Sequence, residues 1–248
     1  MRNRRCRKWD NTKFTMPDTT IIIPQRGHAD LTRDCLTSLR EQDRAAWSVV
    51  VVDDGSPQAA TGLTVEDVSP GQLILQPHRG VSAAWNRGAA ASGTQFLVFL
   101  NNDTISTGPW VDELVRPLRQ RECVLTGVAM RAERALPESL LDQLAMRTFL
   151  AGWCFAISAS VFRELGGFDE SLRVYWSDTD LQLRAALQMR CDSREVLRDV
   201  AGLPLVHLGH RTAHDGRCLP RQREQWCTDR QGFIAKWQQR LAGGVLGP

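Results

Sequence analysis

Residues 49–56 have the sequence Val-Val-Val-Val-Asp-Asp-Gly-Ser. Four consecutive β-branched residues predict a strand that is buried on both faces of a sheet. The two acids that follow cannot both point into an apolar sheet, so we expect Asp53 and Asp54 at its rim, where Gly55 permits a tight turn. Carboxylates at such a place suit a nucleoside base or a ribose hydroxyl, although a helix cap followed by a turn uses the same residue types.

The rest of the first half repeats this alternation of apolar runs and helical patterns. Apolar runs predict further strands at 20–23, 73–75 and 96–100, and helical spacing predicts helices over 30–42 and 80–92. This order predicts an α/β fold with a mostly parallel sheet and helices on both of its faces. In open α/β sheets, ligands bind beyond the carboxyl ends of the strands.

The second half of the chain is less regular. We expect a strand over 123–130, and residues 149–158 form another apolar segment. Pro24 is expected to end the first strand, because proline cannot donate to a ladder. The remaining patterns predict helices at 110–121, 160–165, 178–190 and 221–241, the last one packing back on the body.

Composition favours an ordinary globular enzyme. The chain has 248 residues, of which 42% are hydrophobic and 24% charged. No apolar run approaches the roughly 20 residues of a membrane span and no signal peptide is visible, so we expect a cytoplasmic protein. Residues 1–18 contain five basic residues close together and are expected to form a flexible tail; contact with the inner membrane face is the alternative. Seven scattered cysteines indicate reduced thiols.

A second polar cluster, Asn101-Asn102-Asp103, follows the strand predicted at 96–100. One carboxylate flanked by carboxamides suits Mg²⁺ or Mn²⁺, although a simple turn would also favour these residues. An imidazole downstream could complete the coordination of such a cation. We also considered a structural zinc site, but the spacing matches no common zinc finger. The candidate zinc ligands are His207, His210, His214 and Cys218.

Two acids, Asp178 and Asp180, open the helix predicted at 178–190 and follow Trp176 closely. Free N–H groups and the helix dipole favour acids at this position, so capping accounts for one of them. The other is a candidate base that accepts the proton of a hydroxyl group.

Taken in order, these motifs resemble family 2 glycosyltransferases with the GT-A (Rossmann-like) fold, in a rhamnosyltransferase-like branch. The resemblance covers about residues 19–214. It implies a catalytic domain over 19–216, with a nucleotide-binding half at 19–105 and an acceptor half at 106–216, followed by a C-terminal helix within 217–248. The matching motifs are Ile-Ile-Ile-Pro, Val-Val-Asp-Asp-Gly-Ser, Asn-Arg-Gly-Ala-Ala, Phe-Leu-Asn-Asn-Asp-Thr, Gly-Gly-Phe-Asp-Glu and Trp-Ser-Asp-Thr-Asp-Leu.

The resemblance also implies roles for individual residues. Asp178 corresponds to the general base, while Asp103 and His207 correspond to the metal ligands. The implied acceptor-binding residues are Gly152, Trp153, Trp176 and Ser177. The implied nucleotide-binding residues are Pro24, Asp53, Asp54, Arg79, Asn86, Arg87 and Asn102.

The implied reaction is inverting, metal-assisted transfer of a sugar from a nucleotide-diphosphate-sugar to an acceptor hydroxyl. The acceptor, whether a glycan, a lipid-linked glycan, a protein or another hydroxyl compound, stays open, as do the donor base and sugar. Three positions depart from the family pattern: Gln25-Arg26 replaces Tyr-Asn, Asn101 replaces the first acid of the metal motif, and Ser177 replaces a glutamate. A nucleotidyltransferase and a non-catalytic nucleotide-sugar-binding relative are the alternatives.

Overall fold

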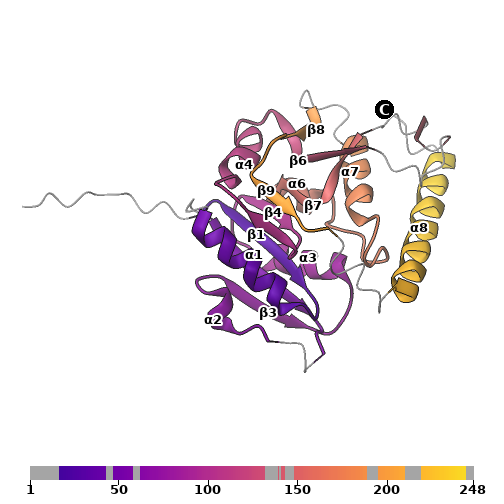
Figure 1. Cartoon of the computed structure of the whole chain (residues 1–248). Helices are drawn as coiled ribbons and strands as arrows, with labels where there is room; N and C mark the ends of the chain where they lie inside the picture. The colour runs from indigo at the N-terminus through magenta and orange to yellow at the C-terminus, as the bar shows by residue number, and fades with distance from the viewer. Residues whose placement is uncertain are drawn as a thin grey trace, which may run out of the picture.

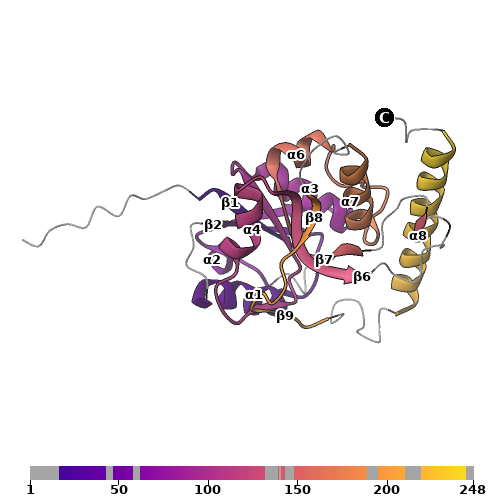
Figure 2. The same ribbon diagram turned by 90° about the horizontal axis from the view of Figure 1, so that it is seen from above.

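A seven-stranded sheet forms the centre of the protein, and helices cover both of its faces (Figures 1 and 2). The strand order is β3-β2-β1-β4-β7-β6-β8, and β5 and β9 form a separate two-stranded sheet. This computed structural model describes residues 17–42, 47–57, 62–131, 139, 141–142, 148–188, 195–209 and 219–243. Residues 1–16 of the predicted tail therefore lie outside the described residues, whereas Asp18 is described and forms an ion pair with Arg119.

The strands and helices have the following bounds. The strands are β1 (Thr19–Gln25), β2 (Trp47–Asp54), β3 (Gln72–Gln76), β4 (Phe96–Leu100), β5 (Thr104–Ser106), β6 (Cys123–Arg131), β7 (Thr148–Ser158), β8 (Glu195–Asp199) and β9 (Leu205–His207). The helices are α1 (Ala29–Gln42), α2 (Val65–Val68), α3 (Val81–Ala91), α4 (Val111–Arg119), α6 (Ala159–Glu164), α7 (Ser177–Gln188) and α8 (Leu219–Ala242).

The sheet is mostly parallel, as the sequence predicts. Strands β3, β2, β1 and β4 run parallel to one another, β7 runs antiparallel to both β4 and β6, and β8 is parallel to β6. Helices α1 and α4 pack on one face, and α3, α6 and α7 pack on the other. Burial on both faces explains why the central strands are continuous apolar runs. The carboxyl ends of β1, β2 and β4 consequently meet at one edge.

The expected end of the first strand at Pro24 is wrong. Strand β1 continues to Gln25, and Pro24 pairs with Val52 of β2. The ladder between β1 and β4 ends earlier, at the pair Ile22–Phe99. Because Pro24 lies beyond that ladder, its missing N–H interrupts no hydrogen bonds to β4.

The apolar segment 149–158, for which we predicted neither helix nor strand, belongs to β7 and contains a bulge. Gly127 of β6 pairs with Phe155, but Ala129 pairs with Leu150, so residues 151–154 bulge out of the β6–β7 ladder. A bulge breaks side-chain alternation and re-aims the residues that it contains. This irregularity explains why the sequence pattern does not identify the strand.

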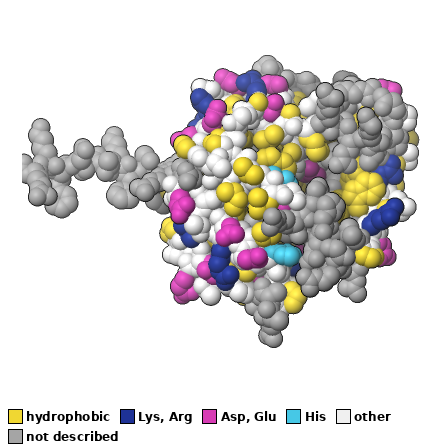
Figure 3. Space-filling model, in the orientation of Figure 1, with side chains coloured by type: hydrophobic (Ala, Val, Ile, Leu, Met, Phe, Trp, Pro, Cys, Tyr) yellow, Lys and Arg dark blue, Asp and Glu magenta, His cyan; other side chains and the backbone are white. Residues whose placement is uncertain are grey.

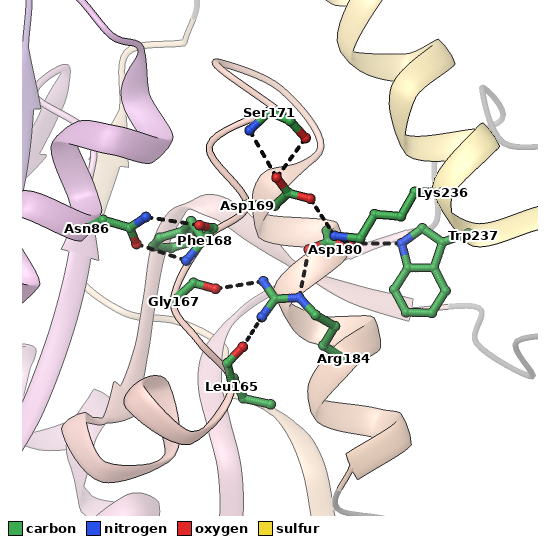
Figure 4. Close-up of polar contacts among 10 residues, drawn as sticks. All are labelled: Asn86, Leu165, Gly167, Phe168, Asp169, Ser171, Asp180, Arg184, Lys236 and Trp237. Carbon is green, nitrogen blue, oxygen red and sulfur yellow. Dashed lines mark hydrogen bonds and ion pairs between the residues drawn. The ribbon is translucent and has the colours of Figure 1, made fainter. Parts of the chain in front are cut away.

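The C-terminal helix packs on the body through a partly buried ionic network (Figure 4). The fully buried carboxylate of Asp180 in α7 lies 2.8 Å from Arg184 Nε and 2.7 Å from Lys236 Nζ of α8. Trp237 Nε1 donates to the same carboxylate at 3.0 Å. Lys236 also lies 2.6 Å from Asp169 Oδ2, so one lysine connects α8 to α7 and to the loop before it.

The surface of the body carries mixed charge. In the face shown in Figure 3, acidic and basic side chains are interspersed over the part that the structure describes. None of the described helices is long and apolar enough to cross a bilayer.

Helix α3 packs tightly on the sheet, and this contact can be tested at Gly88. A Cβ atom there would lie 2.3 Å from Ile22 Cγ2, which is buried. We expect Gly88→Ala to lower the free energy of unfolding by about 1–3 kcal/mol, because overpacking outweighs the gain in helix propensity. Chemical denaturation measures this change. Gly93→Ala is the control, since its Cβ would meet no atom within 4 Å; an equal effect of both variants would contradict the packing argument.

The ionic network should make stability depend on pH. Burial raises the pKa of Asp169, but hydrogen bonds from Lys236 and Ser171 outweigh this effect and lower the pKa to about 2. An unfolded Asp has a pKa of about 3.9, so this stabilisation is complete above that value and is lost as the pH falls towards 2. We expect Lys236→Met to cost about 1–3 kcal/mol at neutral pH.

Urea unfolding at pH 7 and at pH 3 measures the predicted difference. The difference in the free energy of unfolding between Lys236→Met and the unsubstituted protein should be smaller at pH 3 than at pH 7. Arg223→Met, which removes an exposed charge from the same helix, should change stability little at either pH. An equal difference in the free energy of unfolding at both pH values would contradict the role assigned to the Lys236–Asp169 pair.

Candidate functional site

The carboxylate of Asp54, at the end of β2, is buried and accepts four hydrogen bonds. Oδ1 accepts from Gln76 Nε2 at 2.7 Å and from the backbone N–H of Arg79 at 2.8 Å. Oδ2 accepts from the backbone N–H of Gly80 and from His78 Nδ1, both at 2.8 Å. These four donors occupy all the acceptor positions of the carboxylate. Asp54 therefore fixes the turn between β3 and α3. Its predicted contact with a nucleotide stays a prediction.

Asp53 is also buried, but it accepts fewer hydrogen bonds. Gln25 Nε2 donates to Oδ2 at 2.5 Å, and the backbone N–H of Ser56 donates to Oδ1 at 2.7 Å. Gln25 Oε1 lies 3.5 Å from Thr32 Oγ1, which accepts from Asn102 Nδ2 at 3.0 Å. A chain of side-chain contacts thus joins the end of β2 to the turn after β4. Asp53 keeps acceptor capacity for a ligand.

The turn after β4 brings Asp103 against His207. Asp103 is only 2% exposed, and its Oδ1 lies 3.1 Å from His207 Nε2. The small sheet explains this contact, because Thr104 of β5 pairs with His207 of β9. The imidazole also stacks on the Trp153 ring, with ring centres 4.9 Å apart and planes inclined by 8°. The predicted metal ligands are therefore neighbours although they are far apart in the chain.

The bulge in β7 places Gly152 against Asp178. A Cβ atom on Gly152 would lie 2.3 Å from Asp178 Oδ2, so only glycine leaves room for this carboxylate. Asp178 is partly buried in the first turn of α7, whereas Asp180 is fully buried in the ion pairs with Arg184 and Lys236. The two acids thus have different environments. Gly152 contacts Asp178 and the next residue, Trp153, contacts His207.

Two predicted acceptor residues lie in the interior. Trp176 is 6% exposed and its ring packs on Trp226 and Phe233 of α8, with ring centres 5.9 and 5.5 Å away. Ser177 is 1% exposed, and its hydroxyl has no hydrogen-bond partner among the described residues. Their contact with an acceptor stays a prediction, but the structure uses the Trp176 ring for packing.

Two of the predicted diphosphate residues, Arg79 and Asn86, contact the Gly-Gly-Phe-Asp-Glu motif. The Asn86 amide accepts from the Phe168 backbone N–H and donates to the Phe168 carbonyl, both at 2.9 Å. Arg79 forms an exposed ion pair with Glu170 at 2.6 Å. Arg87 is exposed on α3. Asn86 therefore holds the motif in place, and Arg79 pairs with it at the surface.

Two buried cysteines near the turn after β4 are not nucleophilic. Burial raises the pKa of Cys35 to about 11, and it also raises the pKa of Cys154. Both thiols therefore stay protonated at neutral pH and are not nucleophiles. The described cysteines are free, in agreement with the prediction: Cys35, Cys123, Cys154 and Cys227. The other candidate zinc ligands, His210, His214 and Cys218, lie outside the described residues.

Sequence reasoning missed Gln25 and Glu170. Gln25 stands at a position treated as a departure from the family pattern, yet its side chain binds Asp53. Glu170 belongs to a motif that was recognised but given no role, although it pairs with Arg79 and also accepts from Asn86 at 3.1 Å. The residue types alone gave no signal for these contacts, because each partner is distant in sequence.

Comparison with known proteins finds relatives of this chain. Relatives include the O-antigen biosynthesis protein RfbC of Myxococcus xanthus, which is 32% identical over 206 residues covering 69% of this chain and 16% of that protein. The pre-mycofactocin glycosyltransferase of Mycobacterium tuberculosis is 27% identical over 184 residues, covering 62% of this chain and 36% of that protein. The chain thus spans well under half the length of either relative.

Solved structures show the same fold. The mannosyltransferase PcManGT of Pyrobaculum calidifontis, in complex with GDP-Man and Mn²⁺, matches with a TM-score of 0.60 at 17% identity, covering 90% of this chain and 65% of that chain. TarS of S. aureus matches with a TM-score of 0.56 at 14% identity, covering 75% of this chain and 36% of that chain. These likenesses confirm the GT-A fold.

A family model described as glycosyl transferase family 2 matches residues 20–180. The matched region contains the carboxylates at the ends of β2 and β4 and the start of α7. It also falls inside the domain predicted at 19–216, whose internal division stays a prediction. The chain belongs to glycosyl transferase family 2.

Proposed function

We propose that the protein is an inverting glycosyltransferase that transfers a sugar from a nucleotide-diphosphate-sugar to an acceptor hydroxyl with the help of a divalent cation. One observation carries this proposal: Asp103–His207 and Asp178 contact adjacent residues of the β7 bulge, Trp153 and Gly152. A cation-binding pair and a carboxylate base would thus lie on either side of one short segment. The proposal assigns that segment to the sugar and the acceptor.

The nucleotide side of the proposed site lies at the ends of β1 and β2. Asp53 retains acceptor capacity for a base N–H or a ribose hydroxyl, and Gln25 orients its carboxylate. Pro24 precedes Gln25 in the chain, and Asn102 is linked to Gln25 through the Thr32 hydroxyl. Arg79 and Arg87, exposed on or just before α3, supply positive charge for the diphosphate.

The donor set fits a hard divalent cation such as Mn²⁺ or Mg²⁺. Asp103 Oδ1 and His207 Nε2 are 3.1 Å apart, a separation compatible with neighbouring positions around one octahedral ion with bonds of about 2.1 Å. Among the described residues, no three His, Cys, Asp or Glu side chains cluster as a complete metal site. A cation held by one carboxylate and one imidazole would leave positions for phosphate oxygens.

In the proposed reaction, Asp178 accepts the proton of the acceptor hydroxyl. The acceptor oxygen forms a bond to the anomeric carbon, while the bond from that carbon to the diphosphate oxygen breaks on the opposite face. A bound divalent cation supplies positive charge beside the diphosphate as it leaves. Trp153 and Gly152 shape the space next to the base, so that the hydroxyl and the anomeric carbon are held close together.

The metal assignment predicts a defect in donor binding for Asp103→Asn, which keeps the size of the side chain but removes its charge. A thermal-shift screen of UDP-, GDP- and dTDP-sugars, with and without Mn²⁺, first identifies the donor. Calorimetry on that donor should then show at least a tenfold loss of Mn²⁺-dependent affinity in the variant. Unchanged affinity for both donor and Mn²⁺ would remove Asp103 from the metal site.

The base assignment predicts that Asp178→Asn lowers the rate of transfer by about 10²–10⁴-fold while donor affinity stays within about threefold. Release of nucleoside diphosphate in the presence of candidate acceptors measures the rate. Asp30→Asn, an exposed first-turn acid of α1, is the matched control and should keep full activity. Normal transfer by Asp178→Asn would rule out this residue as the base.

The same assays separate the alternatives. Release of pyrophosphate from a nucleoside triphosphate would identify a nucleotidyltransferase instead. Donor binding without turnover, over the whole donor and acceptor panel, would identify a non-catalytic relative.

A further inference from the structure

Helix α8 lies beyond residues 20–180, the part matched by the family model, yet it contacts the segment that leads to Asp178. Figure 1 shows α8 along one side of the body, next to α7 and the loop before it. The contact that matters most is made by Asp229, which is 1% exposed.

The carboxylate of Asp229 accepts hydrogen bonds from three consecutive backbone N–H groups. Oδ2 accepts from Val174 and Tyr175, both at 2.9 Å, and Oδ1 accepts from Arg173 at 3.3 Å. Gln225 Nε2 of the same helix donates to Oδ1 at 2.7 Å. Successive N–H groups that converge on an anion form a rigid nest, which fixes the backbone conformation of the segment.

The other side of this segment is fixed by the start of α3. Ser82 N donates to the Arg173 carbonyl at 3.2 Å, and a Cβ atom on Gly80 would lie 2.5 Å from that carbonyl. Residues 173–175 are therefore held between α8 and the turn that Asp54 organises. A shift of α8 cannot leave this segment unchanged.

The next residue, Trp176, has a left-handed backbone with φ of 70°. A bulky residue at positive φ is unfavourable and persists only where its surroundings hold it. Here the surroundings are Trp226 and Phe233 of α8, which pack on the Trp176 ring. Two residues further on is Asp178.

We propose that α8 positions the base of the transfer reaction, with Asp229 as the positioning residue and the Trp226–Trp176 contact as its second support. The inference rests on the proposed role of Asp178. Asp229 touches neither donor nor acceptor; it sets the backbone path from Arg173 to Asp178, and with it the place of the carboxylate beside Gly152.

Asp229→Asn tests this inference, since it keeps the shape of the side chain but weakens its hydrogen bonds to the N–H groups. Hydrogen–deuterium exchange should show faster exchange at residues 173–175. The kcat for nucleotide release should fall 10–100-fold with the sugar nucleotide that the thermal-shift screen selects. The Kd of that donor should stay within about twofold. The kcat is expressed per donor-binding site counted by calorimetry, so that a loss of folded protein does not lower it.

Two variants of α8 complete the experiment. Glu224→Gln removes an exposed acid from the same helix and should match the unsubstituted protein. Trp226→Leu loosens the packing on Trp176 without changing Asp229. It should also lower kcat while the Kd of the donor stays nearly unchanged, and it tests the inference even if Asp229→Asn does not fold.

The outcomes distinguish this inference from the proposed function. Normal kcat in Asp229→Asn or Trp226→Leu, combined with an inactive Asp178→Asn, overturns the positioning role alone. Normal kcat in Asp178→Asn overturns the base assignment on which the inference rests. Equal losses in kcat and donor affinity would show that α8 supports the whole fold rather than the base.

Discussion

Four hydrogen bonds to the carboxylate of Asp54 hold the parts of the site together. They fix His78, Arg79 and Gly80 at the start of α3. Gly80 lies against the Arg173 carbonyl, and the N–H groups of residues 173–175 bind Asp229. A buried carboxylate without donors costs free energy, so the turn after β3 cannot move without a large penalty. The end of β2 is thereby coupled to α8 through short, direct contacts.

The parallel part of the fold could be predicted from the sequence because its signals are local. Runs such as Val49–Val52 and Phe96–Leu100 are apolar since both faces of the sheet are covered, and the polar clusters after them mark the edge of the sheet. The prediction was wrong at Pro24, where a proline is tolerated because the ladder to β4 has already ended. It gave no conformation for 149–158, because the bulge at 151–154 removes the alternation that identifies a strand.

The candidate site, like the fold, could be predicted from the sequence only in part. The order of motifs pointed to Asp53, Asp103 and Asp178, since each follows a predicted strand or opens a predicted helix, and to His207 as a histidine downstream of them. The contacts that organise these residues could not be predicted, because they join positions far apart in the chain. Gln25 lies next to Asp53 only when β1 and β2 are paired, and Asp229 looks like any acid on an amphipathic helix until its N–H partners are known.

In the two pairs of acids that contain a proposed site residue, Asp53–Asp54 and Asp178–Asp180, one carboxylate serves the structure. The Asp54 carboxylate accepts four hydrogen bonds, and the buried Asp180 carboxylate contacts Arg184, Lys236 and Trp237. Their neighbours, Asp53 and Asp178, are the acids that the proposal assigns to nucleotide and acceptor. Fixing one acid rigidly restricts the backbone of the other, so the reacting carboxylate loses little freedom when substrate binds. Asp54 and Asp180 therefore explain why pairs are present although the proposed chemistry uses one member of each.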